Sequence, residues 1–191
     1  MSDFERFASA MRGFGIACDC ESIERLAIFR HAFFAWNTTH NISAVRDSRT
    51  FERYCIDCAY PLRFVRPFAS LLDVGSGGGF PALVLGALVP SAHLCLVEPN
   101  KKKAAFLLIA SQQMGLHCTI LRKRIENIQG QSAELLCSRA LCAPDVFLPL
   151  VAHICTRAIL LYTGSQKLAN SEITGFVHEH YETIHYLYKE L

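Results

Sequence analysis

A glycine-rich turn between an apolar run and a candidate helix start constrains the fold of this chain more than any other feature. Residues 71–74 are Leu-Leu-Asp-Val, residues 75–79 are Gly-Ser-Gly-Gly-Gly, and Phe80 and Pro81 follow. Glycines adopt positive φ values and let a ligand approach the backbone without meeting a Cβ. Proline is favoured in the first turn of a helix. A buried strand that turns in this way into a helix predicts a site for a nucleotide-like cofactor.

Beyond Pro67, short apolar runs alternate with helical segments. The expected strands are 70–74, 93–97, 118–121, 134–137, 158–162 and one near 183–188, and the expected helices are 81–89, 101–114 and 145–154. This alternation predicts an α/β fold of the Rossmann-like kind, with a mostly parallel sheet and helices on both faces. In such sheets the ligand lies at the carboxyl ends of the strands, where the strand order reverses.

The region before Pro67 predicts helices instead. Residues 1–66 are expected to form a helical N-terminal extension packed on the core, and residues 67–191 the α/β domain. We expect a short amphipathic helix over 3–12, a longer one capped by Ser22, and a third capped by Asp47 or Ser48. The polar run 37–41 predicts the end of the second helix. Beyond Gly164 we expect a helix and one or two final strands.

Composition narrows the class of protein. The longest apolar stretches fall far short of the roughly 18 residues that span a bilayer, and the N-terminus resembles no signal peptide. Nine cysteines, an odd number with scattered spacing, fit a reduced cytoplasmic protein better than a disulfide framework. Neither Cys18-x-Cys20 nor Cys55-x-x-Cys58 has a second pair at zinc-finger spacing, so we expect no metal. We expect a monomer that does not associate with membranes.

The acidic residues around the glycine turn bear on the identity of the cofactor. Glu98 ends the second strand, 19 residues past Gly79, where a carboxylate accepts hydrogen bonds from both ribose hydroxyls of a nucleoside. Asp73 stands two residues before the first glycine, where it suits the cationic amino acid end of S-adenosylmethionine and opposes a pyrophosphate. These features favour a methyltransferase over a nicotinamide-dependent oxidoreductase, which stays an alternative. Glu126 follows the third strand, where it either contacts adenine or caps a helix.

Several further motifs occur in a fixed order along the chain. They are Trp36-Asn37, Asn41–Asp47, Arg53–Cys58, Asp73–Pro81, Glu98 with Lys102 or Lys103, Arg124-Ile125-Glu126 and Ser138-Arg139-Ala140. In these motifs the sequence resembles the bacterial 16S ribosomal RNA guanine-N7 methyltransferases, also called glucose-inhibited division protein B. Asp73–Pro81 is very close to that family's Asp-Val-Gly-Ser-Gly-x-Gly-Phe-Pro loop, and Phe80-Pro81 is its distinctive part.

The resemblance implies a class I methyltransferase fold with a helical N-terminal extension, with 67–191 as the methyltransferase domain. It also implies S-adenosylmethionine as cofactor and N7-methylguanosine in 16S rRNA as product, with the small ribosomal subunit or its assembly intermediate as partner. The implied cofactor-binding residues are Asp73, Gly75, Ser76, Gly77, Gly79, Phe80, Glu98, Ile125, Glu126 and Arg139. A methyltransferase of another RNA or of a small molecule, and a non-catalytic RNA-binding module, remain alternatives.

Two positions depart from the family pattern. Tyr54 replaces a histidine, and Tyr162-Thr163-Gly164 stands where the family has Leu-Lys-Gly. A basic residue near the site is therefore missing, and Lys167 is a candidate substitute.

The chemistry of guanine N7 agrees with the motifs that are present. This nitrogen carries a lone pair and no proton, so its methylation needs positioning of the base and no general base. The chain has no Asn-Pro-Pro-Tyr tetrad after the fourth strand, and Ser138-Arg139-Ala140 stands there instead. Because a cation held against N7 would repel the developing positive charge, we assign Arg139 to recognition of guanine O6 or of a phosphate.

Two basic triplets are candidates for RNA contact, although the formal net charge of the chain is only +2. They consist of Lys101, Lys102 and Lys103, and of Arg122, Lys123 and Arg124. Cations at the start of a helix oppose its dipole, and a bound phosphate backbone would offset that cost. An ordinary solvated rim is the alternative. Phe80 is a candidate for stacking on a base, or for packing in the core.

Overall fold

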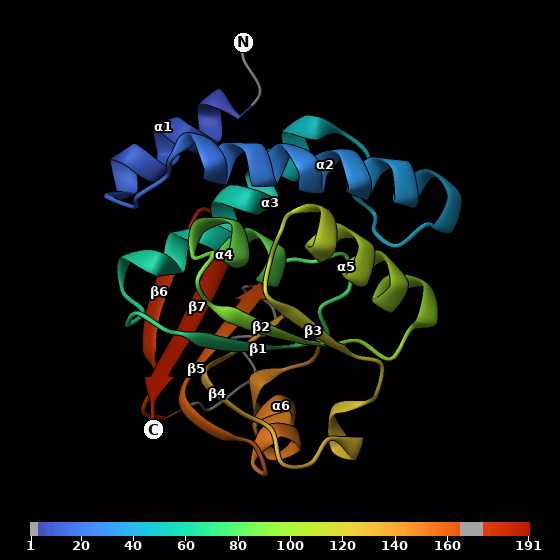
Figure 1. The fold of residues 1–191 in the computed structure, drawn as a ribbon. Coiled ribbons are helices and arrows are strands. Elements are labelled where there is room, and N and C mark those ends of the chain that lie inside the picture. Colours follow the sequence, from blue (N-terminus) through green and yellow to red (C-terminus); the bar gives the residue numbers. More distant parts are fainter. Residues whose placement is uncertain (1–3, 165–173) are drawn as a thin grey trace.

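The computed structural model describes residues 4–164 and 174–191, which form one mixed sheet with helices on both faces (Figure 1). The strands lie in the order β3-β2-β1-β4-β5-β7-β6. Their bounds are β1 Ser70–Val74, β2 His93–Val97, β3 Cys118–Leu121, β4 Ser132–Arg139, β5 Cys155–Gly164, β6 Val177–Tyr181 and β7 Ile184–Glu190. The predicted α/β class is therefore confirmed.

The first five strands are parallel, whereas β7 runs antiparallel to them and β6, which pairs antiparallel with β7, runs in the direction of the first five. Leu71 of β1 stands opposite Leu94 of β2 on one side and Leu135 of β4 on the other. β7 runs antiparallel between β5 and β6. The strand order reverses between β1 and β4, which is where ligands bind in sheets of this kind.

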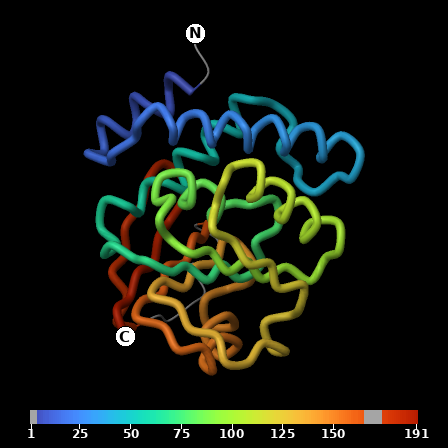
Figure 2. The backbone as a smooth tube through the Cα atoms, in the orientation of Figure 1, coloured from blue at the N-terminus to red at the C-terminus, as the bar shows by residue number. Residues whose placement is uncertain are grey.

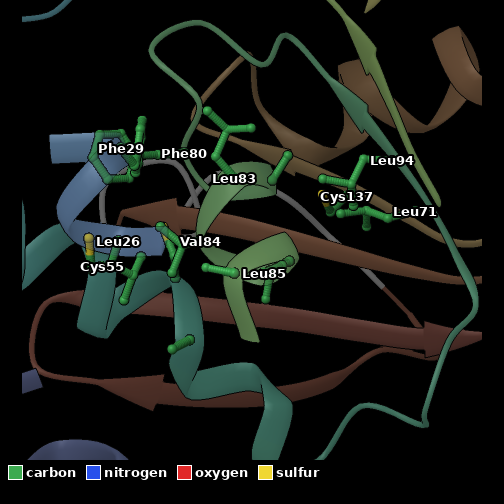
Figure 3. Close-up of a cluster of buried hydrophobic side chains, with 14 of the residues drawn as sticks. Leu26, Phe29, Cys55, Leu71, Phe80, Leu83, Val84, Leu85, Leu94 and Cys137 are labelled. Atoms are coloured by element: carbon green, nitrogen blue, oxygen red, sulfur yellow. The ribbon is translucent and has the colours of Figure 1, made fainter. Parts of the chain in front are cut away.

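Apolar side chains on both faces of the strands explain why the sheet is buried between two layers. Leu71 faces one core cluster and its neighbour Leu72 faces the other, as the two-residue period of a strand requires. Figure 3 shows Leu71 beside Leu94 and Cys137, which come from three adjacent strands. Helices α4, Ala82–Leu88, and α5, Lys101–Gln113, contribute to the first cluster, and α6, Pro144–Val151, to the second.

Three N-terminal helices lie over the first of these layers (Figures 1 and 2). They are α1 Glu5–Phe14, α2 Cys20–His40 and α3 Ser48–Ala59, and the 3-10 turn η1, Tyr60–Arg63, follows. Helix α2 packs against α4 and α5 through Phe29 and Phe33, whose rings lie 5.2 and 5.7 Å from that of Phe80. Figure 3 shows Phe29 and Phe80 side by side. These helices and the sheet therefore share one hydrophobic core.

One local prediction in this region was wrong. Helix α2 begins after Asp19, whose carboxylate accepts a hydrogen bond from the Ser22 amide at 2.8 Å, so Asp19 and not Ser22 is the cap. The helix ends at His40, within the polar run 37–41 as predicted, and the Asn37 side chain bonds the following loop at Ser43 and Val45. Asp47 caps α3 by accepting from the Thr50 amide, as predicted.

The C-terminal part contains the two strands expected there. Residues 165–173, with Lys167, lie outside the described part of the chain, as does any helix predicted among them. None of the described helices is long and apolar enough to cross a membrane.

Candidate active site

The glycine turn joins the end of β1 to α4 and is fixed to the end of β2. The amides of Gly75 and Ser76 donate to the Val97 carbonyl at 2.9 and 3.2 Å. Gly79 has a φ of 90°. A Cβ on this residue would lie 2.7 Å from the Leu83 side chain and 3.1 Å from that of Phe29. Only glycine therefore fits where the turn passes under α2, which is a packing requirement.

Glu98 connects the turn to the residues that follow β2. Its Oε2 accepts a hydrogen bond from the Gly77 amide and its Oε1 one from the Asn100 amide, both at 2.9 Å. The residue is only 6% exposed. An ionised carboxylate has about four acceptor positions, so two remain for hydroxyl groups of a ligand.

Asp73 lies fully buried beneath the turn. Its Oδ1 accepts from the Cys137 thiol at 3.3 Å, and within the described part of the chain its Oδ2 has no hydrogen-bond partner. Burial raises the pKa of this carboxyl to about 7, the nearby Ser76 hydroxyl and Cys137 thiol act in the opposite direction, and the charge of Glu98 raises it further. A buried acceptor without a partner is rare in proteins, and it fits a site that a cationic or hydrogen-bonding ligand completes.

A cavity of about 400 Å³ opens at the carboxyl ends of the central strands. It is lined by Tyr54, Gly75, Ser76, Gly77, Gly78, Phe80, Arg139, Ala140, Tyr162, Thr163, Gly164 and Ile184. Five of the sequence-predicted site residues are among them. Arg139 is the only charged residue in this lining, which contains no carboxylate and no imidazole among the described residues.

Arg139 is held in this cavity by aromatic rings and by two groups of α3. Its guanidinium carbon lies 4.1 Å from the centre of the Tyr54 ring and 5.8 Å from that of Phe80, within the range of cation–π interaction. One nitrogen lies 3.6 Å from Asp57 Oδ2, and another donates to the Cys58 sulfur at 3.5 Å. The side chain is only 12% exposed, so the cavity presents a desolvated and oriented cation.

Asp57 is the acidic partner of Arg139 and is itself buried. Burial raises the pKa of its carboxyl to about 6, while Arg139 and Arg53 act in the opposite direction. Two tyrosines fix the backbone of this segment: Tyr186 donates to the Asp57 carbonyl and Tyr162 to the Cys58 carbonyl, each at 2.9 Å. Helix α3 is thereby tied to β5 and β7.

The structure does not bring the remaining predicted residues into the cavity lining. Gly79 faces Leu83 and Phe29, and Asp73 and Glu98 support the turn from below and beside it. Ile125 is buried in the short turn η2, Ile125–Asn127, while Glu126 is exposed. Phe80, a candidate for base stacking or for core packing, packs in the core and also lines the cavity.

The six basic residues of the two triplets lie at the carboxyl ends of β2 and β3. Five are exposed and Lys103 is half-buried. None of them forms a salt bridge within residues 4–164 and 174–191. The lysines begin α5, where the Asn100 side chain caps the amides of Lys102 and Lys103. The described residues contain no cluster suited to a metal ion.

Sequence reasoning missed the groups that surround Arg139. Asp57, Tyr162 and Ile184 come from three different elements, and none stands in a motif that carries chemistry by itself. The available signal for Asp57 was its place in the segment Arg53–Cys58, which contributed to the family resemblance.

Solved structures with a similar fold include rRNA methylases. An rRNA methylase from Escherichia coli has a TM-score of 0.59 and 12% identity, and the match covers 85% of this chain and 77% of that one. The 16S rRNA methylase RmtB has a TM-score of 0.58 and 15% identity, over 98% of this chain and 82% of its own. At these identities the likeness shows the fold alone, that of the class I methyltransferases.

Sequence comparison identifies the family. The ribosomal RNA small subunit methyltransferase G of Wolinella succinogenes is 34% identical over 184 residues, which cover 94% of this chain and 95% of that protein. The protein of the same name from Helicobacter pylori is 40% identical over 151 residues, 75% of this chain and 85% of its own. The family model described as rRNA small subunit methyltransferase G matches residues 22–188. The chain therefore belongs to the rRNA small subunit methyltransferase G family.

Proposed function

We propose that this protein transfers a methyl group from S-adenosylmethionine to N7 of a guanine in 16S rRNA. The observation that carries this proposal is the cavity in which the glycine turn meets the stacked, desolvated guanidinium of Arg139. The names of the relatives supply the substrate class. We propose the small ribosomal subunit or its assembly intermediate as the form in which the rRNA is bound. A monomeric state and a cytoplasmic location remain predictions.

The residues at the end of β1 and β2 suit the proposed cofactor. When bound, S-adenosylmethionine supplies an electrophilic methyl group on a sulfonium. The buried Oδ2 of Asp73 is an acceptor for its ammonium group, and the free acceptor positions of Glu98 suit ribose hydroxyls. Gly75 and Gly77 allow close approach to the backbone of the turn. Ile125 and Glu126 are proposed to lie beside the adenine.

The substrate end of the cavity suits a purine whose reacting nitrogen carries no proton. Arg139 donates hydrogen bonds, which fits the O6 edge of guanine or a phosphate. Asp57 and the Tyr54 ring hold its guanidinium in one orientation, so less freedom is lost when the base binds. Since the lining holds no carboxylate or imidazole among the described residues, it suits a transfer that depends on positioning.

Methyl transfer to defined acceptors tests the proposal. The protein would be incubated with tritiated S-adenosylmethionine and with 30S particles, protein-free 16S rRNA or a protein acceptor. We expect label in rRNA, and mass mapping should locate it as a single N7-methylguanosine. Calorimetry with S-adenosylhomocysteine and with NAD tests the cofactor separately. The proposal would be contradicted if the protein bound NAD but not S-adenosylhomocysteine. It would also be contradicted if the label appeared only in the protein acceptor.

A further inference from the structure

A second hollow lies beside the candidate active site, on the N-terminal helices. Its volume is about 510 Å³, and it is lined by Arg6 of α1, by Arg49, Thr50, Glu52, Arg53 and Ile56 of α3, and by Glu182 of the turn between β6 and β7. We call it the arginine hollow, after Arg6, Arg49 and Arg53. None of its residues belongs to the site described above.

The hollow adjoins the active-site cavity through two shared elements. Arg53 lies in the hollow, and the next residue, Tyr54, lines the cavity, with the guanidinium carbon of Arg53 5.8 Å from the Tyr54 ring centre. Likewise Glu182 lines the hollow, and Ile184 at the start of β7 lines the cavity. An extended ligand strand that leaves the cavity between α3 and the β6–β7 hairpin would therefore meet the arginines next.

The three arginines of the hollow are exposed, and they share it with two carboxylates, those of Glu52 and Glu182. None of the three forms a salt bridge within the described part of the chain. Glu52 is engaged elsewhere, since its Oε1 accepts the Phe7 amide at 3.0 Å and so holds α1 against α3. Arg49 and Arg53 are four residues apart on one helix, and like charges at this spacing repel each other. An anion bound between them would remove that repulsion.

The strand order places the hollow and the basic triplets on opposite sides of the cavity. The triplets follow β2 and β3 at one end of the sheet, while the turn that carries Glu182 joins β6 and β7 at the other end. The cavity lies between them, at the carboxyl ends of β1, β4 and β5. Thr163, where the family pattern has a basic residue, pairs with His185 of β7 and so lies on the side of the cavity towards the β6–β7 turn. The arginines of the hollow therefore supply positive charge on the side of the cavity where this basic residue is missing.

We propose that the arginine hollow binds backbone phosphates of the substrate RNA on the side of the target nucleotide opposite to the basic triplets. The inference rests on the proposed function, because it takes RNA as the substrate. Guanidinium groups bind phosphate oxygens with paired hydrogen bonds, and arginine is favoured over lysine at such sites. With phosphates held on both sides, the target base between them is positioned over Arg139.

The test is the salt dependence of RNA binding by a triple variant of the full chain, Arg6→Gln with Arg49→Gln and Arg53→Gln. Each phosphate contact in a single strand contributes about 0.7 to the slope of log affinity against log salt, so three lost contacts lower it by about 2. We expect this decrease with 30S particles and with protein-free 16S rRNA. The KM for 30S particles should rise about 10-fold or more while kcat changes little.

A matched control removes the same charge elsewhere. Arg25→Gln, Arg66→Gln and Arg157→Gln change residues whose partners are Glu21, Glu190 and Glu134 at the surface, away from the cavity lining. The pairs of Arg66 and Arg157 are exposed, and exposed pairs contribute little to stability. We expect a nearly unchanged salt slope in the control. Thermal unfolding and S-adenosylhomocysteine binding should be the same in both variants and the wild type.

Three results would overturn the inference while leaving the proposed function intact. They are a salt slope equal to that of the control, an unchanged KM, and weaker binding to 30S particles with unchanged binding to protein-free rRNA. The last would assign the hollow to an acidic partner protein instead. By contrast, a wild-type protein that neither binds nor methylates rRNA would refute the proposed function itself.

Discussion

Replacing Asp73 by asparagine should stabilise the fold and weaken cofactor binding at the same time. The carboxyl is fully buried, one of its oxygens has no hydrogen-bond partner among the described residues, and its pKa is raised to about 7. Asparagine has nearly the same shape and carries no charge. The variant therefore separates the cost of the buried charge from the packing of the side chain.

The size of the effect follows from the pKa shift. The pKa of the carboxyl moves from 3.8 to about 7 on folding. At about 1.4 kcal/mol per pKa unit, the ionised form destabilises the folded state by about 4 kcal/mol. Because the folded pKa is raised, this cost is absent below pH 3.8, grows as the pH rises and is complete above about pH 7. Removing the charge should stabilise the variant by this amount, less about 1 to 3 kcal/mol because the asparagine amide is itself incompletely hydrogen-bonded in this position.

Urea unfolding of both proteins between about pH 4 and pH 8 measures this cost. The difference between their unfolding free energies cancels all other titrating groups, and it should change by about 4 kcal/mol in favour of the variant as the pH rises. Asp47→Asn is a control of opposite sign, because hydrogen bonds from the Thr50 amide and hydroxyl lower the pKa of the Asp47 carboxyl. In that pair the wild type should lose stability relative to the variant only as the pH falls below about 3.8, so the difference should stay nearly constant between about pH 4 and pH 8.

Calorimetry with S-adenosylhomocysteine completes the experiment. Binding of an ammonium group to Asp73 requires the ionised carboxylate, so wild-type affinity should increase as the pH rises towards about 7 and then level off. Asp73→Asn should bind about 10- to 100-fold more weakly, with that pH dependence lost. A stability difference that does not change with pH would refute the argument from burial. Unchanged affinity in the variant would refute the assigned role of Asp73.

Three further substitutions address other parts of the site. Asp57→Asn should keep cofactor binding and lower methyl transfer about 10-fold, because Arg139 loses its buried partner. With S-adenosylmethionine saturating at every pH, so that protonation of Asp73 does not limit the rate, wild-type rates should fall below about pH 6, where Asp57 takes up a proton; a variant with the same acid limb would contradict this. Arg139→Lys keeps the charge but loses the stacking of the planar guanidinium on Tyr54. Methyl transfer should therefore drop, while calorimetry should show unchanged affinity for S-adenosylhomocysteine. Loss of cofactor binding would show that Arg139 has a different role. Glu98→Ala should weaken S-adenosylhomocysteine binding about 10-fold and speed hydrogen exchange at the Gly77 amide, because the carboxylate that accepts its hydrogen bond is removed. Unchanged exchange would mean that the turn does not depend on Glu98.

The cofactor end of the site was predictable because its residues follow one another along the chain. Asp73 and the glycine turn come directly after β1, and Glu98 ends β2, which is the neighbouring strand. The alternation of apolar runs therefore places these groups together without knowledge of distant contacts. Local capping was less predictable, since Asp19 and Ser22 are both good caps and the choice depends on how the chain enters α2.

The substrate end could not be predicted in the same way. Tyr54 and Asp57 on α3 meet Arg139 on β4, and the tyrosines that fix them lie on β5 and β7, more than 100 residues further along the chain. No periodicity in the sequence determines that β7 inserts between β5 and β6, or that α3 lies over their ends. Only the order of the family motifs pointed to this segment.

The cofactor end and the substrate end of the active site therefore differ in how they depend on the N-terminal helices. The sheet, with the turns that follow β1, β2 and β3, supplies every group proposed for the cofactor. Helix α3 supplies the aromatic ring and the carboxylate that orient Arg139, together with two arginines of the hollow. Because these helices share a core with the sheet through Phe29 and Phe80, they cannot shift without moving the glycine turn. Substrate positioning is thus mechanically linked to the cofactor site through one cluster of packed rings.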